Sequence, residues 1–376
     1  MKYPSPCFVL DEARLRSNLE LIGRVQRESG AQIILAFKGF AMWSTFPILR
    51  EYIHGATASS LSEARLCHEE MGTKAHTYSV AYLPSEFGKI LKLSSHITFN
   101  SLSQWKKYRN KVLNAPEKVS PGIRVNPGWS PVKTDLYNPA SAGSRLGEPV
   151  ENFKSRFPDG IEGLHFHVLC ESSSHDLETT LGHFEKQFGA FLPKLKWVNF
   201  GGGHLMTRKG YDTDHLIRVI QAFRKRHPNL QVILEPGSAF AWDAGILVAT
   251  VLDIVSNKGV KTANLDVSFT AHMPDTLEMP YRPGVRDAVA DASTAKYRYR
   301  LGGISCLSGD FMEEYGFDKP LKVGQQIVFE DMIHYTMVKT TAFNGVTHPS
   351  IAILRPDGKL DVVRKFGYKD YKNRLS

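Results

Sequence analysis

Residues 33–38 read "IILAFK", an apolar run that ends on a lysine. This run is the first of eight short apolar or β-rich segments. The others are "GATASS" (55–60), "AHTYSV" (75–80), "HITFN" (96–100), "GIRVN" (122–126), "GLHFHVL" (163–169), "WVNFGGG" (197–203) and "QVILEPG" (231–237). Most stretches between them show the amphipathic pattern of helices. Eight strands that alternate with helices predict an α/β fold, a (β/α)8 TIM barrel.

Several of these segments end in residues suited to chemistry. They are Lys38, Ser59, Asn100, Asn126, His167, the glycines 201–203 and Glu235. In this type of barrel the carboxyl ends of the strands converge on one face, where active sites lie. The pattern therefore predicts a functional site that includes Lys38.

A second domain is predicted after the barrel. Beyond about residue 245 the sequence changes to strand-like runs such as "GILVATVLDIV" (245–255) and "QQIVFED" (325–331), which are typical of all-β structure. The N-terminal "PCFVLD" is predicted to add a strand to it. We therefore expect a barrel over residues 12–245, and a β-sandwich or β-barrel domain formed by residues 1–11 and 246–376.

Composition excludes several classes of protein. The net charge of the 376 residues is +9, but Lys and Arg are spread along the chain, so no nucleic-acid partner is expected. The longest apolar stretch contains Asp253 and is too short to span a membrane. The four cysteines form no C-x-x-C pair, which indicates neither a disulfide framework nor a structural zinc site. A cytoplasmic protein is expected.

Three elements suggest a cofactor site, and each has a simpler alternative. Lys38 either extends its ammonium group to solvent or stands as a neutral amine, which can form a Schiff base with an aldehyde cofactor. "FGGGH" (200–204) suits a phosphate but also a tight turn. Glu235 either keeps a pyridinium nitrogen of the cofactor protonated or is an ordinary acid at the surface.

Two histidines share one face of a predicted strand. His165 and His167 alternate in "HFHVL", and such a pair can bind a metal. A metal site needs further ligands, whereas the later strand ends provide Gly201 and Glu235. No metal is therefore expected; stacking of an imidazole on a planar ring is the alternative use of such a pair, and packing and hydrogen bonding are the simpler role of His165.

The order of these motifs resembles one enzyme group. "LAFK", "HFHV", "GGG" and "EPG" resemble the lysine, histidine, phosphate and acid motifs of the fold-type III pyridoxal 5'-phosphate (PLP) enzymes, which include alanine racemase and the ornithine and diaminopimelate decarboxylases. "SCLSGD" (305–310) resembles the cysteine motif of the decarboxylases, and "HYTMVKTTAFNG" (334–345) resembles their tyrosine motif. The resemblance covers essentially the whole chain and favours decarboxylases over racemases.

The resemblance implies a role for each matching residue. Lys38 would carry PLP, His167 would stack on its ring and Glu235 would bind the ring nitrogen. The phosphate would be held by Gly201, Gly202, Gly203, Gly237 and Tyr335. The family also implies a homodimer with shared active sites, in which Cys306 of one subunit donates a proton in the site of the other.

Departures from the family pattern narrow the range of possible substrates. Leu307 follows the cysteine where an acid is usual, Ser238 replaces the usual arginine after E-P-G, and Thr57 replaces an aspartate of ornithine decarboxylases. "HMPDTLEMPYRP" (272–283), "AFKGFA" and "SCLSGD" resemble carboxynorspermidine/carboxyspermidine decarboxylases. That resemblance implies a carboxy-lyase of polyamine biosynthesis, which forms norspermidine or spermidine.

A polyamine-like substrate carries distal cationic amines, which need carboxylates. The candidate ligands are Asp275 and Asp310, with Glu235 and His272 as weaker candidates; hydrogen bonding within loops is the alternative role of both aspartates. Three other functions stay open. They are decarboxylation of diaminopimelate, ornithine, lysine or arginine, metal-dependent hydrolysis at His165 and His167, and a non-catalytic binding role.

Overall fold

The computed structural model describes residues 3–134, 137–153, 157–279 and 281–376. Its internal contacts divide the chain into two units. Residues 18–240 form the barrel unit, and residues 1–17 together with 241–376 form the sheet unit. The boundaries at residues 11/12 and 245/246 stay a prediction.

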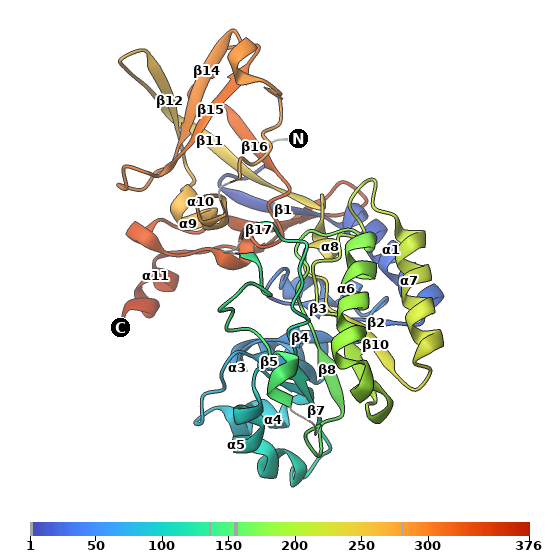
Figure 1. Cartoon of the computed structure of the whole chain (residues 1–376). Coiled ribbons are helices and arrows are strands. Elements are labelled where there is room, and N and C mark those ends of the chain that lie inside the picture. Colours follow the sequence, from blue (N-terminus) through green and yellow to red (C-terminus); the bar gives the residue numbers. More distant parts are fainter. Residues whose placement is uncertain (1–2, 135–136, 154–156, 280) are drawn as a thin grey trace. The chain divides into compact units, whose positions relative to one another are not determined.

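The barrel unit is built on a parallel sheet (Figure 1). Its strands are β2 (Gln32–Ile33), β3 (Leu35–Ala36), β4 (Ala56–Ala58), β5 (Ala75–Ser79), β6 (Ser94–Phe99), β7 (Ser120–Arg124), β8 (Gly163–His165), β9 (Trp197–Asn199) and β10 (Gln231–Leu234). Only Ile34 separates β2 from β3. Because β2 pairs with β10 and β3 pairs with β4, this one stretch closes the sheet. The predicted TIM barrel and its eight strand segments are confirmed.

Helices follow most of the barrel strands. They are α2 (Phe46–Leu49), α3 (Leu61–Leu66), α4 (Phe87–Lys92), α5 (Leu102–Leu113), α6 (Ser174–Phe188), α7 (Thr213–Arg226) and α8 (Ser238–Ala241), and α1 (Glu12–Ser29) precedes β2. Between β7 and β8 the described residues form no α-helix, and they include a 3-10 turn, Val150–Phe153. The sequence there is rich in proline, glycine and serine, which interrupt helical periodicity.

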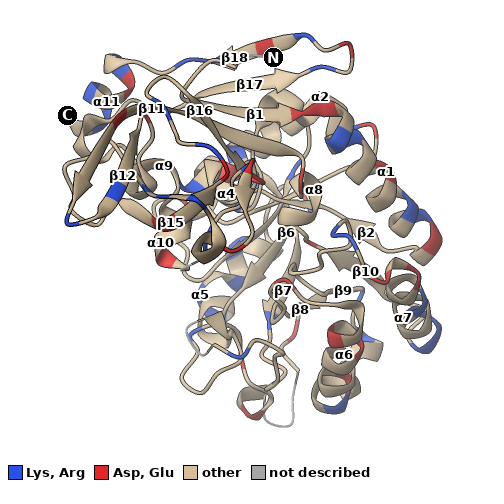
Figure 2. Cartoon of the chain, turned by 90° about the horizontal axis from the view of Figure 1, so that it is seen from above, with Lys and Arg blue, Asp and Glu red and all other residues tan. Residues whose placement is uncertain are grey.

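Charged residues lie on the exposed faces of the barrel helices. Figure 2 shows residues of both signs along α1 and α7. Arg24 of α1 pairs with Glu28 at 3.0 Å and with Asp214 of α7 at 2.5 Å. The opposite face of α7 is apolar and buried, as its helical periodicity predicts.

The sheet unit contains a second sheet of mixed direction. Its strands are β1 (Cys7–Asp11), β11 (Gly245–Asn257), β12 (Val260–Leu265), β13 (Ala288–Val289), β14 (Tyr297–Gly302), β15 (Phe311–Phe317), β16 (Gln326–Glu330), β17 (Ser350–Leu354) and β18 (Leu360–Arg364). The short helices α9 (Phe269–His272) and α10 (Pro274–Glu278) follow β12, and α11 (Tyr368–Leu375) ends the chain. β1 lies between β11 and β17, so the N-terminal strand belongs to this sheet. Among the described residues, no helix combines the length and hydrophobicity that a membrane span requires.

Candidate active site

Lys38 lies two residues after the end of β3, at the carboxyl end of the barrel sheet. Its side chain is accessible to solvent but is surrounded by protein on most sides. Burial lowers the pKa of the Lys38 amine, and the positive charge of Arg124 lowers it further. The location of Lys38 therefore favours a neutral, nucleophilic amine.

The hydrogen bonds of His167 lead to the same conclusion. The backbone N–H of Gly202 donates to Nδ1 of His167 at 2.8 Å, and Nε2 lies 3.2 Å from Nζ of Lys38. Burial lowers the pKa of His167 well below its usual value, and the charge of Arg124 adds to the effect. Because Nδ1 accepts, the neutral ring carries its proton on Nε2. That N–H donates to Lys38, which can accept only as an unprotonated amine.

Glu235 is held by Asn199 at the end of β9. Nδ2 of Asn199 donates to Oε1 of Glu235 at 2.6 Å, while its Oδ1 accepts the N–H of Gly201 at 2.8 Å. Burial raises the pKa of Glu235, and the hydrogen bond from Asn199 and the charge of Arg124 oppose that rise. Asn199 thus fixes the carboxylate to the glycine turn and favours its charged form.

The glycines 201–203 allow a close approach of backbone segments. Gly201 and Gly203 have φ angles of 71° and 89°, which disfavour other residues. A Cβ atom on Gly202 would lie 2.5 Å from the carbonyl oxygen of Glu235. The amides of Gly201 and Gly202 donate to Asn199 and His167, so the predicted role of this turn in phosphate binding stays a prediction.

Gly237 contacts the segment that follows the neighbouring strand. A Cβ atom on Gly39 would lie 2.8 Å from Cα of Gly237, so the segments after β3 and β10 touch through two glycines. This contact keeps Lys38 and Glu235, which flank these glycines in the sequence, in the same part of the barrel. The predicted phosphate contact of Gly237 is not tested by these distances.

Arg124 is a site residue that the sequence analysis did not single out. It is 4% exposed at the end of β7, and it donates to Oη of Tyr78 and to the carbonyl oxygen of His167, both at 2.9 Å. An arginine within an apolar strand is unusual unless its charge is used, and "GIRVN" contained that signal. Arg124 places a positive charge beside the site and lowers the pKa of Lys38.

His165 is completely enclosed in the barrel. Its Nε2 lies 3.8 Å from Oε2 of Glu235, and neither ring nitrogen has a hydrogen-bond partner in the structure. Its ring meets the ring of Tyr78 edge-on at 5.5 Å. Within the described part of the chain, His165 and His167 do not belong to any cluster of three metal-ligating groups.

The candidate residues of the sheet unit lie on three segments. Cys306 is an exposed thiol on the loop of residues 303–310, between β14 and β15. Asp310 holds that loop, since its Oδ1 accepts the N–H of Thr270 at 3.0 Å and its Oδ2 accepts the hydroxyl of Ser305 at 2.6 Å. Both oxygens are engaged, which favours the alternative, structural role of Asp310.

Asp275 differs from Asp310 in having an oxygen available. Its Oδ2 accepts the hydroxyls of Tyr281 at 2.7 Å and Thr336 at 2.8 Å, whereas its Oδ1 is buried without a hydrogen-bond partner. Tyr335, the predicted phosphate ligand, precedes Thr336 and has a φ angle of 50°. Of the two candidate aspartates, Asp275 is therefore better suited to bind a cationic group.

His272 has the wrong polarity for a cation ligand in this conformation. Its Nδ1 accepts the N–H of Ser268 at 3.1 Å, so the neutral ring carries its proton on Nε2. Burial lowers the pKa of His272 to about 4, with a smaller contribution from His348. A neutral ring that offers only a donor does not attract an ammonium group.

Comparison with known proteins agrees with this chemistry. The family model described as "Pyridoxal-dependent decarboxylase, C-terminal sheet domain" matches residues 7–333. A carboxyaminopropylagmatine decarboxylase of Synechocystis is 54% identical over 99% of this chain and 95% of its own length. A carboxynorspermidine/carboxyspermidine decarboxylase of Campylobacter jejuni is 44% identical over 99% of both chains.

A solved structure is also similar over its full length. The crystal structure of carboxynorspermidine decarboxylase from Campylobacter jejuni, complexed with norspermidine, superposes with a TM-score of 0.91 at 43% identity and covers 99% of this chain and 100% of the other. The neutral amine of Lys38, the imidazole of His167 and the enclosed carboxylate of Glu235 fit PLP. The chain therefore belongs to the pyridoxal-dependent decarboxylases, and PLP is its cofactor.

Proposed function

We propose that this enzyme removes the α-carboxylate of carboxynorspermidine or carboxyspermidine and forms norspermidine or spermidine. The observation that carries this proposal is the full-length similarity to the Campylobacter jejuni enzyme bound to norspermidine, at a TM-score of 0.91. The similarly named relative, at 44% identity, supports the same substrate class.

The barrel residues have complementary roles in this reaction. PLP, when bound, supplies a ring that accepts the electrons left when CO2 departs. Lys38 supplies the neutral amine that holds the cofactor, and His167 presents Nε2–H toward that amine. Glu235, oriented by Asn199, is the carboxylate that keeps the pyridine nitrogen protonated. Arg124 supplies positive charge that favours the ionised form of Glu235.

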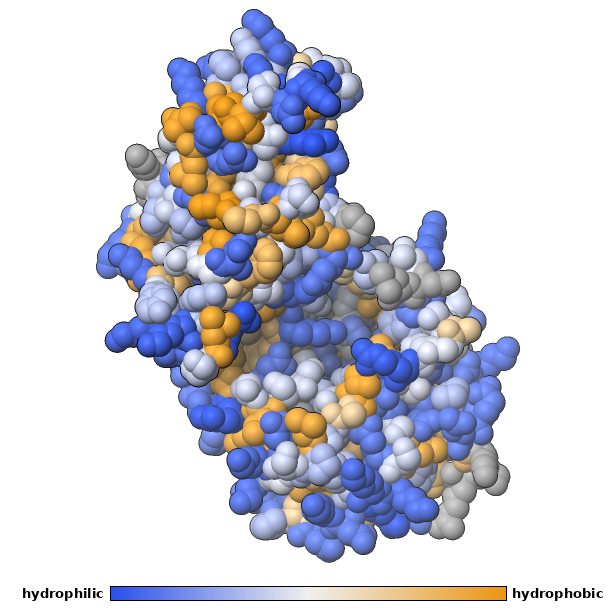
Figure 3. Space-filling model, turned by 90° about the vertical axis from the view of Figure 1, so that its left-hand side faces the viewer, coloured by the Kyte–Doolittle hydropathy of each residue, from blue (hydrophilic) through white to orange (hydrophobic). Residues whose placement is uncertain are grey.

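Return of a proton to the α-carbon requires a donor, and we assign it to Cys306. The thiol is exposed on its loop, and its backbone N–H donates to Oδ1 of Asn344 at 2.8 Å. Figure 3 shows hydrophobic side chains at the surface of the sheet unit, and on the cysteine loop Ile304 and Leu307 are 45% and 44% exposed. Exposed apolar residues beside an exposed thiol support a homodimer in which this loop enters the partner's site.

The distal amine of the substrate is assigned to Asp275. The unpartnered Oδ1 of this buried carboxylate can accept a charge-assisted hydrogen bond from an ammonium group. Asp310 is a weaker ligand because both of its oxygens already accept hydrogen bonds. His272 is weaker because its neutral ring offers only a donor. Four free cysteines support a reducing compartment, the cytoplasm, as the place of the reaction.

A second substrate, carboxyaminopropylagmatine, is favoured by the 54% identical Synechocystis relative. This molecule ends in a guanidinium group, which binds best to two carboxylate oxygens at once. Asp275 has one oxygen free and the other occupied by two hydroxyls, an arrangement that suits a single ammonium donor better. Carboxyaminopropylagmatine shares with carboxynorspermidine and carboxyspermidine the α-amino acid group that decarboxylation requires.

Release of CO2 by the PLP-loaded enzyme tests the proposal. The assay compares carboxynorspermidine, carboxyspermidine, carboxyaminopropylagmatine, meso-diaminopimelate, ornithine, lysine and arginine, with Lys38→Ala as the inactive control. Turnover is expected on the carboxylated polyamines, with the first two preferred. Preference for carboxyaminopropylagmatine would select the second substrate, and preference for diaminopimelate or a simple amino acid would refute both.

A further inference from the structure

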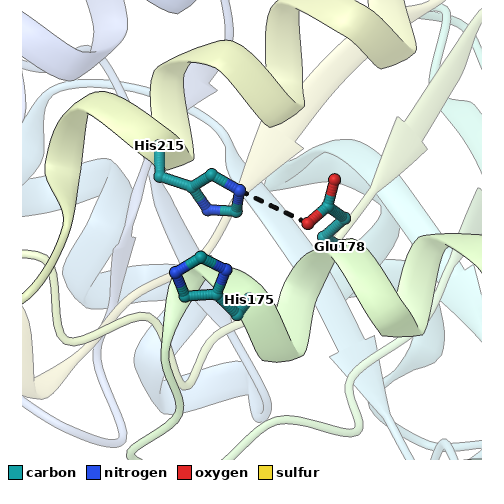
Figure 4. A group of neighbouring side chains, drawn as sticks. All are labelled: His175, Glu178 and His215. Carbon is teal, nitrogen blue, oxygen red and sulfur yellow. Dashed lines mark ion pairs between the residues drawn. The ribbon is translucent and has the colours of Figure 1, made fainter.

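A cluster of three metal-ligating side chains lies on the helices of the barrel unit, outside the residues assigned to decarboxylation. His175 and Glu178 come from the first turns of α6, and His215 comes from the first turn of α7 (Figure 4). One ligand atom from each side chain lies within 4.8 Å of the other two. We propose that these residues bind a divalent transition-metal ion, with zinc as the best-matched ion.

The spacing on α6 brings two ligands to one side of the helix. Residues i and i+3 are neighbours on a helix surface, so His175 and Glu178 both face α7. Nε2 of His215 lies 3.3 Å from Oε2 of Glu178, and the rings of the two histidines stack at 4.0 Å with an angle of 26° between them. Ligand atoms around a tetrahedral zinc ion lie roughly 3.3 Å apart, so the three atoms must move closer together when zinc binds. The side chains of His175 and Glu178 can make this adjustment because they are exposed.

A second hydrogen bond orients the third ligand. Oγ of the buried Ser174 lies 3.0 Å from Nδ1 of His215. When Nδ1 donates to this hydroxyl, the lone pair of the neutral ring is on Nε2, the atom that faces Glu178. Metal-bound histidines are oriented in this way by a partner at the other ring nitrogen.

The donor set selects the type of ion. Two imidazoles and one carboxylate are typical zinc ligands, and a solvent-accessible cluster leaves a fourth position for water. Imidazole also suits nickel and copper, whereas magnesium and calcium require oxygen ligands. The positive ends of the α6 and α7 dipoles disfavour a cation, and the negative charge of Glu178 and of the capping Asp176 and Asp212 offsets this effect.

An ion at this position would connect two segments of the active site. The segment before α6 is joined to the glycine turn, since the N–H of Ser172 donates to the carbonyl oxygen of Gly203 at 2.9 Å. An ion shared by α6 and α7 would link the segments that follow β8 and β9, which carry His167 and the glycines 201–203. The expected outcome is a folded state that zinc stabilises, because the site does not exist in the unfolded chain.

Calorimetric titration of the chelator-treated, PLP-loaded enzyme with zinc tests the site. We expect one zinc equivalent whose affinity falls by about tenfold or more in His175→Ala and in Glu178→Gln. His68→Ala, which removes another exposed histidine, is expected to leave that equivalent unchanged. Equal zinc affinity in all four proteins would overturn the proposal, as would equally tight binding of magnesium.

Thermal unfolding provides an independent measurement. Zinc should raise the unfolding temperature of the wild type and of His68→Ala, and should raise it less or not at all in Glu178→Gln. Without zinc, Glu178→Gln should unfold close to the wild-type temperature, because Glu178 is exposed. An identical zinc-dependent rise in the wild type and Glu178→Gln would contradict binding at this cluster.

Discussion

The backbone N–H of Gly202 donates to Nδ1 of His167 at 2.8 Å, and this single bond determines the chemistry of the opposite ring nitrogen. Nε2 must carry the proton of the neutral ring, and it lies 3.2 Å from Nζ of Lys38. The glycine turn therefore acts on the lysine through the imidazole. Glu235 is connected to the same turn through Asn199, so one turn orients the lysine, the histidine and the acid.

Substitution Gly202→Ala should weaken PLP binding. Its Cβ atom would lie 2.5 Å from the carbonyl oxygen of Glu235 and 3.2 Å from Cε1 of His167, so the turn must move. We expect the dissociation constant of PLP to rise by about tenfold or more, measured by fluorescence titration of the apo-enzyme. Gly182→Ala is the control, because this exposed glycine of α6 has no atom within 4 Å of the added Cβ. Unchanged PLP affinity in Gly202→Ala would show that the turn does not orient the cofactor site.

Substitution Asn199→Asp should move the pH dependence of kcat. A second carboxylate at 2.6 Å raises the pKa of Glu235 further, because like charges disfavour ionisation. Glu235 then stays protonated to higher pH and cannot hold the ring nitrogen protonated. The acidic limb of the kcat profile is therefore expected at higher pH than in the wild type. Asn152→Asp introduces the same change beside Glu148, away from the glycine turn, and should leave the profile unchanged. A shift of equal size in both variants would remove the assigned role of Glu235.

Removal of the charge of Arg124 should slow the capture of PLP at neutral pH. This arginine lowers the pKa of Lys38, so Arg124→Gln raises that pKa and increases the fraction of unreactive ammonium at any given pH. The rate of PLP association, followed by stopped-flow absorbance across a pH series, should show an acidic limb displaced to higher pH. Arg24→Gln, an exposed change on α1, serves as the control. A limb that stays in place, or moves to lower pH, would mean that Lys38 does not sense this charge.

Substitution Asp275→Asn should affect substrate binding more than turnover. Asn keeps an oxygen for the hydroxyls of Tyr281 and Thr336 but removes the negative charge that would bind the distal amine. A charge-assisted hydrogen bond contributes about 1.5–3 kcal/mol, so KM for carboxynorspermidine should rise about 10- to 100-fold. Asp357→Asn, at an exposed hairpin turn, should leave KM unchanged. Loss of kcat with unchanged KM would assign the distal amine to another residue.

Local sequence patterns were sufficient to predict the strand ends and much of the candidate site. Lys38, His167 and Glu235 were predictable because each ends an apolar strand, and parallel strands bring their carboxyl ends together. Asn199 and Arg124 were missed because their roles depend on which partners face them across the barrel. Most stretches between the strands were predicted to be helical, but the described part of the loop between β7 and β8 forms a 3-10 turn and no α-helix, because proline, glycine and serine interrupt helical periodicity there.

The same limit applies to the acids and to the metal cluster. Asp275 and Asp310 are equivalent in the sequence, and only their hydrogen bonds show that one has a free oxygen and the other has none. His175 and His215 are 40 residues apart in the chain and meet only because α6 packs against α7. Such relationships arise from packing and leave no local pattern.

The attachment of PLP to Lys38 can be measured directly. Borohydride reduces the C=N bond between the cofactor's aldehyde carbon and the lysine amine of the PLP-loaded enzyme to a stable secondary amine. Peptide mass spectrometry then locates the modified lysine. We predict one pyridoxyl group per chain, on Lys38, and none in Lys38→Ala. A pyridoxyl group on another lysine, or none in the active wild-type enzyme, would contradict this prediction.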